Sequence, residues 1–159
     1  MLKLCGKDFT NMTNKYKQIQ LTNSNIGDVA VDGFIPLGIV TRRINAPFNC
    51  CNTFVVGSTQ ADTLTITEPG FYKVTYSLSA ETAAEGTVTV SLLTNGTSVY
   101  SVSSAVTAAD TPVNVTLPYT IRVCPNCAST PTNCPVVIQL QISDTAITGV
   151  SGNLIVEKI

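Results

Sequence analysis

Apolar and polar residues alternate with a period of two along most of this chain, and this pattern restricts the fold more than any other feature. In the longest run, 113–123, every second residue from Val113 to Val123 is apolar or aromatic. Similar alternations occupy 72–79, 87–92 and 136–143. Because successive side chains of a β-strand point to opposite faces, the period predicts strands with one buried face. A helical period fits none of these windows better, so we expect eight or nine strands and an all-β fold.

Turn-forming residues separate the predicted strands. Glu68-Pro69-Gly70, Asn95-Gly96 and Thr148-Gly149 interrupt the alternation, and Asn-Gly between two alternating runs is a strong hairpin signal. The stretch 80–85 is helix-prone but too short to form a helix alone. Pro118 lies on the outward phase of its run and has no N–H, which predicts an edge strand or a bulge. Short strands joined by turns indicate an antiparallel sandwich or a barrel.

The first 32 residues differ from the rest of the chain. They are rich in charged and polar residues, and their few apolar residues follow no firm period. We expect 1–32 to be an N-terminal arm with one or two short strands at 18–21 and 29–31, and 33–159 to be a head domain; a frayed terminus is the alternative for 1–32. Within the head, 35–40 is apolar on both phases, which predicts a strand covered on both sides.

Length and charge restrict the class of protein. A chain of 159 residues is long enough for one domain with its own core. Nine basic and ten acidic residues give a net charge of -1, so no basic field for nucleic acid is present. No apolar run approaches the length that crosses a membrane. We therefore expect neither a nucleic-acid partner nor a membrane partner.

The sequence offers little for catalysis. It contains no histidine, which is the commonest general acid–base group and the commonest metal ligand. Glu81 and Glu85 are the only close acidic pair, and paired carboxylates across a cleft can hydrolyse glycosides. Two glutamates around Thr82-Ala83-Ala84 are nevertheless more typical of a solvated loop. We expect no enzymatic activity, no catalytic residues and no cofactor.

Six cysteines are the remaining candidates for special chemistry. Cys124-Pro125-Asn126-Cys127 followed by Cys134 resembles half a zinc site, and Cys50 or Cys51 could supply a fourth thiolate. Disulfides within that loop, or from Cys50 or Cys51 to it, are an equally open interpretation, and free thiols are a third. In each case we expect these cysteines to fix a long loop without a catalytic role. We do not adopt the zinc interpretation, and so we expect no resident metal.

The order of segments resembles the tumour necrosis factor and complement globular-head superfamily. The residues that carry the resemblance are 65–79, where a strand ends in Pro69-Gly70 and re-enters as Tyr72-Lys73-Val74-Thr75-Tyr76. The strand before Asn95-Gly96 and the closing segments 136–142 and 151–156 are also similar to the family pattern. The resemblance implies a ten-stranded TNF-like jelly roll over about 34–159 that assembles as a homotrimer.

The nearest relatives in pattern are heads of bacterial exosporium collagen-like proteins and heads of phage fibres and capsid decorations. No Gly-x-y stalk precedes the head here, so the arm 1–32 is expected to make the attachment. We therefore expect a structural virion protein of a bacteriophage, a trimeric capsid decoration or head-fibre subunit on the virion surface. The alternative is a receptor- or glycan-binding head on a fibre or on a spore or cell surface.

Apolar residues on both phases of some strands also favour subunit contacts. Ile39 precedes Val40, Val136 precedes Val137, and Ile155 lies between Leu154 and Val156. A lone sandwich buries only one face of each sheet, so we expect other subunits to cover the second face.

Overall fold

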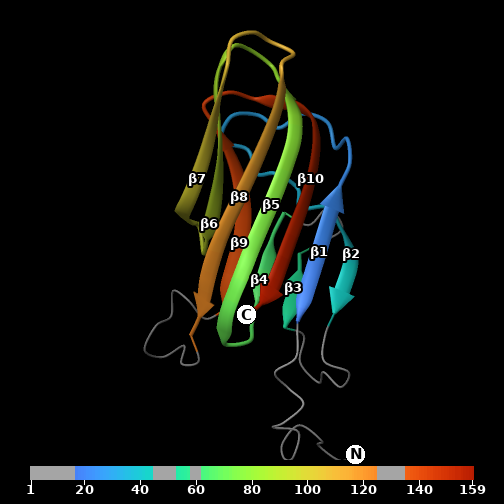
Figure 1. The fold of residues 1–159 in the computed structure, drawn as a ribbon, viewed down its shortest axis with the longest axis vertical. Coiled ribbons are helices and arrows are strands. Elements are labelled where there is room, and N and C mark those ends of the chain that lie inside the picture. Colours follow the sequence, from blue (N-terminus) through green and yellow to red (C-terminus); the bar gives the residue numbers. More distant parts are fainter. Residues whose placement is uncertain (1–16, 45–52, 58–61, 125–134) are drawn as a thin grey trace, which may run out of the picture.

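The computed structural model describes residues 17–44, 53–57, 62–124 and 135–159, and Figure 1 shows their arrangement. These residues form strands and turns, and none of them forms a helix long and apolar enough to span a membrane. The ten strands are β1 (Gln18–Asn23), β2 (Ile39–Ile44), β3 (Phe54–Val56), β4 (Leu64–Ile66), β5 (Gly70–Thr82), β6 (Gly86–Thr94), β7 (Thr97–Val106), β8 (Pro112–Val123), β9 (Val136–Ser143) and β10 (Ile147–Lys158).

The strands form two five-stranded sheets that pack face to face as a sandwich. Sheet A has the order β2-β1-β10-β5-β8, and sheet B has the order β3-β4-β9-β6-β7. All the strand pairs within these sheets are antiparallel. In Figure 1, β1, β10, β5 and β8 lie side by side as one layer, with β6, β9 and β4 behind it. The predicted all-β antiparallel sandwich is confirmed.

The core lies between the sheets and follows from the alternation. On β5 the inward residues Tyr72, Val74 and Tyr76 are at most 1% exposed, whereas Lys73 and Ser77 between and beside them are exposed. The ring of Tyr72 meets the ring of Phe54 edge to face, with centroids 6.0 Å apart. Hydrophobic burial of these inward faces is the main term that stabilises the two layers.

Two local predictions agree with the structure. Asn95 and Gly96 form a two-residue turn between β6 and β7 with φ angles of 50° and 80°, the left-handed values of a type I′ hairpin. Pro118 lies on β8, the edge strand of sheet A. An edge strand has a neighbour on one side only, so it tolerates a residue without an N–H.

The described part of the predicted arm, from Lys17 onward, lies within the sandwich. β1 lies inside sheet A between β2 and β10, and its Ile19 and Leu21 are fully buried. Farther along, the N–H of Val29 donates to the carbonyl of Ile147 at 2.8 Å. The sandwich therefore includes chain from Lys17 onward, because two apolar residues in a short strand suffice to bury one face. Residues 1–16 of the predicted arm lie outside the described residues.

The predicted two-sided strand at 35–40 is not formed: residues 35–37 lie outside the strands, and β2 begins only at Ile39. Ile35 and Leu37 are buried as expected, but Ile39 is 67% exposed at the start of β2. Between them, Gly38 has a φ of 90°, and a side chain at this position would collide with the carbonyl of Thr22. The chain therefore changes direction at Gly38 and continues as an exposed edge strand.

Candidate functional site

The structure places one of the five predicted structural cysteines. Cys124 follows the end of β8, is 8% exposed and forms no disulfide with any other described residue. Cys50, Cys51, Cys127 and Cys134 lie outside the described residues, so their pairing stays a prediction. Within the described ranges, no three His, Cys, Asp or Glu side chains come close enough to hold a metal ion.

The acidic pair considered in the sequence lies at the end of β5. Glu81 is the second-last residue of this strand and Glu85 is in the loop that follows, and both are exposed. Exposure of both carboxylates fits a solvated surface. The larger surfaces of the sandwich are the stronger candidates for a functional role.

The outward face of sheet A is built from uncharged side chains in register, most of them small and polar. Across four strands, Thr22 of β1 pairs with Asn153, Asn153 with Ser77, and Ser77 with Thr116. A second row runs through Gln20, Ile155, Thr75 and Pro118, and a third row through Ser151, Ser79 and Asn114. We call these three rows the polar face, and none of its side chains carries a charge.

Side-chain hydrogen bonds hold part of the polar face in place. Gln20 Nε2 donates to Asn153 Oδ1 at 2.9 Å, and Thr22 Oγ1 donates to the same oxygen at 3.3 Å. The hydroxyl groups of Thr22 and Thr41 are 3.1 Å apart, which links β1 to β2. These polar groups already form hydrogen bonds with one another across the sheet. Another protein surface can therefore cover them at a smaller desolvation cost than it would cover polar groups without partners.

A shallow groove of about 370 Å³ crosses the polar face. Ser77, Ser79, Ser151 and Gly152 are among its lining residues, and the groove exists because these side chains are small. Gly152 lies on the inward phase of β10, where a Cβ would collide with the hydroxyl of the core residue Tyr76 and lie 3.0 Å from two of its ring carbons. The groove can accept a protruding side chain of a partner.

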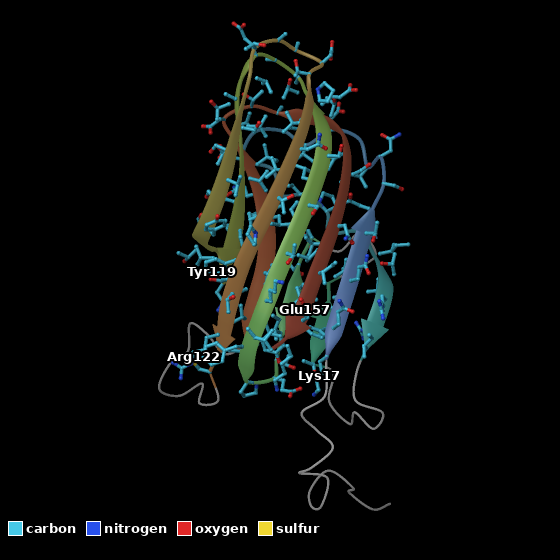
Figure 2. All side chains as sticks on the ribbon, in the orientation of Figure 1. Lys17, Tyr119, Arg122 and Glu157 are labelled. Carbon is cyan, nitrogen blue, oxygen red and sulfur yellow. The ribbon has the colours of Figure 1, made fainter. Side chains whose placement is uncertain are left out.

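Larger side chains gather along the edge of the sandwich formed by β7 and β8, with Phe71 of β5 beside them. Tyr100 and Tyr119 stack with centroids 5.7 Å apart, and Tyr100 is 38% exposed. Arg122 lies 5.9 Å from the ring of Phe71, which is 51% exposed. Figure 2 shows Tyr119 and Arg122 along the same strand, β8. We call this the aromatic edge.

An ion cluster centred on Glu68 closes one end of the sandwich. Lys17 and Lys158 each form an ion pair with the carboxylate of Glu68, the latter at 2.7 Å, and Thr53 Oγ1 donates to it at 2.7 Å. Burial opposes ionisation of Glu68, but the hydrogen bonds from Lys158, Lys17 and Thr53 outweigh it and lower its pKa from 4.5 to about 2. The cluster ties both ends of the described chain to the turn before β5; Lys17 is labelled in Figure 2.

Sequence reasoning missed the polar face and the ion cluster. The outward phases of 72–79 and 113–123 carry the Thr and Ser residues of the face, so that part of the signal was visible. The pairing of Thr22 with Asn153 and of Lys17 with Glu68 joins residues 131 and 51 positions apart. Such long-range neighbours follow from strand order, which the alternation does not specify.

Comparisons with known proteins identify the architecture. No protein-family model and no curated protein matches the sequence. Among solved structures, the chain is similar to the PRD1 vertex protein P5 with a TM-score of 0.59 and 12% identity, over 90% of this chain and 96% of that one. It is similar to Eiger TNF from S. frugiperda with a TM-score of 0.64 and 8% identity, over 91% and 92% of the two chains.

A third similar structure is the globular domain of the zebrafish complement 1qA protein. Its TM-score is 0.57 with 10% identity, over 89% of this chain and 94% of that one. At these identities the likeness shows the fold alone. The chain has the TNF-like jelly-roll fold that the Pro69-Gly70-x-Tyr72 motif predicted.

Proposed function

We propose that this chain is a structural virion protein of a bacteriophage, a capsid decoration or head-fibre subunit that acts as a homotrimer. In this role the chain has no catalytic activity and no resident cofactor. The polar face of sheet A is the observation that carries the proposed assembly.

The polar face lacks the charged side chains that would be costly to bury under another protein. Charged residues are depleted at the centres of interfaces because burying an unpaired charge is costly. On the four strands of the face, charged side chains lie only beyond the three uncharged rows. Lys73 and Glu157, 3.9 Å apart, lie beyond one end of the rows, and Glu81 lies beyond the other. An uncharged face with small side chains lets a neighbouring backbone approach closely.

The aromatic edge supplies the complementary groups. Tyr119 and Tyr100 are larger than the serines of the groove, and they lie at the side of the sandwich formed by β7 and β8. Contact between an edge of one copy and a face of the next joins two different surfaces, so it closes only as a ring. The superfamily resemblance implies that this ring has three members.

The virion location is supported by fold and sequence pattern. One similar structure is named as a vertex protein of PRD1, and the sequence pattern resembles heads of phage fibres and capsid decorations. In this proposal the residues before β1 contact the particle, and the head projects outward.

A receptor- or glycan-binding head is the second candidate function. Phe71 and Tyr100 are the observation that favours it, since both aromatic side chains are more than one-third exposed. Exposed aromatic rings supply the flat apolar contacts that many ligands use. In the first proposal the same rings are covered by the neighbouring subunit.

Quantitative mass spectrometry of purified particles from cells that produce this chain tests the proposed function. Many copies per particle are expected for a capsid decoration. A few copies per particle would favour a receptor-binding head on a fibre. Absence of the chain from washed, intact particles would overturn the virion assignment.

A further inference from the structure

The turn between β6 and β7 contains the one Asn-Gly pair of the sequence, Asn95-Gly96. Both residues are exposed, and both have positive φ angles. A Cβ added to Gly96 would meet no atom within 4 Å, so the peptide bond between the two residues lies in open space. Water can reach this turn from outside.

The side chain of Asn95 is nevertheless held against the start of β9. Its Oδ1 accepts a hydrogen bond from the N–H of Val137 at 2.7 Å, and its Nδ2 donates to the carbonyl of Pro135 at 3.2 Å. The backbone N–H of Asn95 also donates to the carbonyl of Val137 at 2.9 Å. The amide of Asn95 therefore joins the hairpin end to β9 much as a strand residue would.

An Asn-Gly pair has a reaction of its own. The backbone nitrogen of Gly96 can attack Cγ of Asn95, forming a C–N bond while the Cγ–Nδ2 bond breaks and ammonia leaves. Water then opens the resulting succinimide at either carbonyl and gives aspartate or isoaspartate. Glycine favours the attack because it has no side chain to block the nitrogen.

We propose that Asn95 is a modification site whose spontaneous deamidation is blocked by its hydrogen bonds to β9. The attack requires the carboxamide of Asn95 to rotate toward Gly96, and this rotation breaks the bonds to Val137 and Pro135. Reaction is then confined to moments when the hairpin end separates from β9. Protection of Asn95 in this way does not depend on the proposed function.

Deamidation of Asn95 would make the separation of the hairpin end from β9 permanent. Aspartate at position 95 replaces the Nδ2 donor with an oxygen, which faces the carbonyl of Pro135 without a hydrogen. Isoaspartate lengthens the backbone by one carbon, and the two-residue turn geometry is lost. The modification therefore converts a brief local opening into a lasting loss of the Asn95 side-chain contacts with Pro135 and Val137.

Peptide mapping by mass spectrometry tests the proposal on the full chain. The chain is aged in mildly alkaline buffer, folded in one sample and unfolded by urea in the other. We expect deamidation at Asn95 to be slower in the folded sample by about tenfold or more, since the bonds to Val137 and Pro135 must break first. Equal rates in the two samples would overturn the proposal.

A second measurement separates the side-chain bonds from folding as a whole. Asn95→Gly keeps a residue suited to the turn and removes the side chain. Amide exchange at Val137 is expected to be faster in this variant, whereas exchange at Val90 in the middle of β6 stays unchanged. Unchanged exchange at Val137 would show that the side chain does not hold β9, and would also overturn the proposal.

Discussion

Glu68 connects three parts of the chain that are far apart in sequence. Its carboxylate receives the ammonium groups of Lys17 and Lys158, and the carbonyl of Glu68 accepts the hydroxyl of Tyr72 at 2.9 Å. Burial, together with the negative charge of Glu68, raises the pKa of Tyr72 and keeps this hydroxyl protonated as the donor. One residue thus fixes the start of β1, the end of β10 and the turn into β5.

The pH dependence of stability tests this role of Glu68. Because its pKa is lowered from 4.5 in the unfolded chain to about 2 in the fold, its contribution is present above pH 4.5. That contribution disappears as the pH falls from 4.5 to about 2. With allowance for solvent screening, Glu68→Gln should lower the free energy of unfolding by roughly 2 kcal/mol at neutral pH and flatten its dependence on pH in this range.

Glu85→Gln is the matched control for that measurement, because Glu85 is exposed in a loop. Urea unfolding at several pH values should leave the Glu85→Gln profile close to that of the parent chain. If Glu68→Gln gave the same profile as the control, the ion cluster would have no stabilising role.

Tyr76 and Gly152 form a tight buried pair that can be tested by substitution. The hydroxyl of Tyr76 is buried and has no hydrogen-bond partner in the described part of the chain. Tyr76→Phe should therefore preserve or raise stability, by up to about 1 kcal/mol. Gly152→Ala should cost about 1–3 kcal/mol, because its methyl group meets the Tyr76 ring.

The double variant shows whether the two effects are coupled. Removal of the Tyr76 hydroxyl should relieve part of the collision. The double variant Tyr76→Phe with Gly152→Ala should therefore have a higher free energy of unfolding than the effects of the two single changes predict when added. Additive free energies of unfolding in chemical denaturation would argue against the contact.

At the scale of the strands, alternation predicted β5, β8 and β9 because each has four or more inward apolar residues. The sequence also predicted a short strand at 18–21, which agrees with β1, but it did not show that this strand belongs to the sandwich, since only Ile19 and Leu21 alternate with the outward Gln20 and Thr22. A short strand with a polar outward face is hard to separate from an extended arm by composition. The register that joins β1 to β10 is a property of the whole sheet.

The polar face could not be predicted from the sequence, because it also depends on which strands are neighbours in the sheet. Alternation identifies Ser77 and Thr116 as outward residues of their own strands, but it does not place them beside each other. The strand order of sheet A creates the face, and that order follows from packing contacts between distant segments.

Substitutions in β1 test whether this strand belongs to the head. Ile19→Ala and Leu21→Ala each remove a fully buried side chain and should cost about 2–4 kcal/mol. Gln20→Ala, on the outward side of the same strand, should cost about 0.5 kcal/mol. Chemical denaturation measures all three, and an equally small effect at each position would restore the arm interpretation for this segment.

At the scale of the whole molecule, the proposed contact joins the polar face of one copy to the aromatic edge of another. A charge placed at the centre of the face should break this contact without unfolding the sandwich, because Ser77 and Thr116 are exposed in the single chain. We expect Ser77→Glu and Thr116→Glu to give folded monomers, measured by circular dichroism and gel filtration.

The control for these charges lies on the other layer. Thr87 is an exposed residue of β6 in sheet B, so Thr87→Glu adds the same charge away from the polar face. The control variant should keep the oligomeric state of the parent chain. Dissociation by Thr87→Glu as well would indicate a general effect of charge, and would remove the support for this interface.

Light scattering coupled to gel filtration of the parent chain tests the central claim most directly. Assembly through the polar face and the aromatic edge predicts a particle of about three times the chain mass of 16.8 kDa. The mass should persist on dilution into the micromolar range, because a subunit of a capsid decoration or head fibre must stay assembled on the particle. A clean monomer under these conditions would contradict the trimer and the role assigned to the polar face.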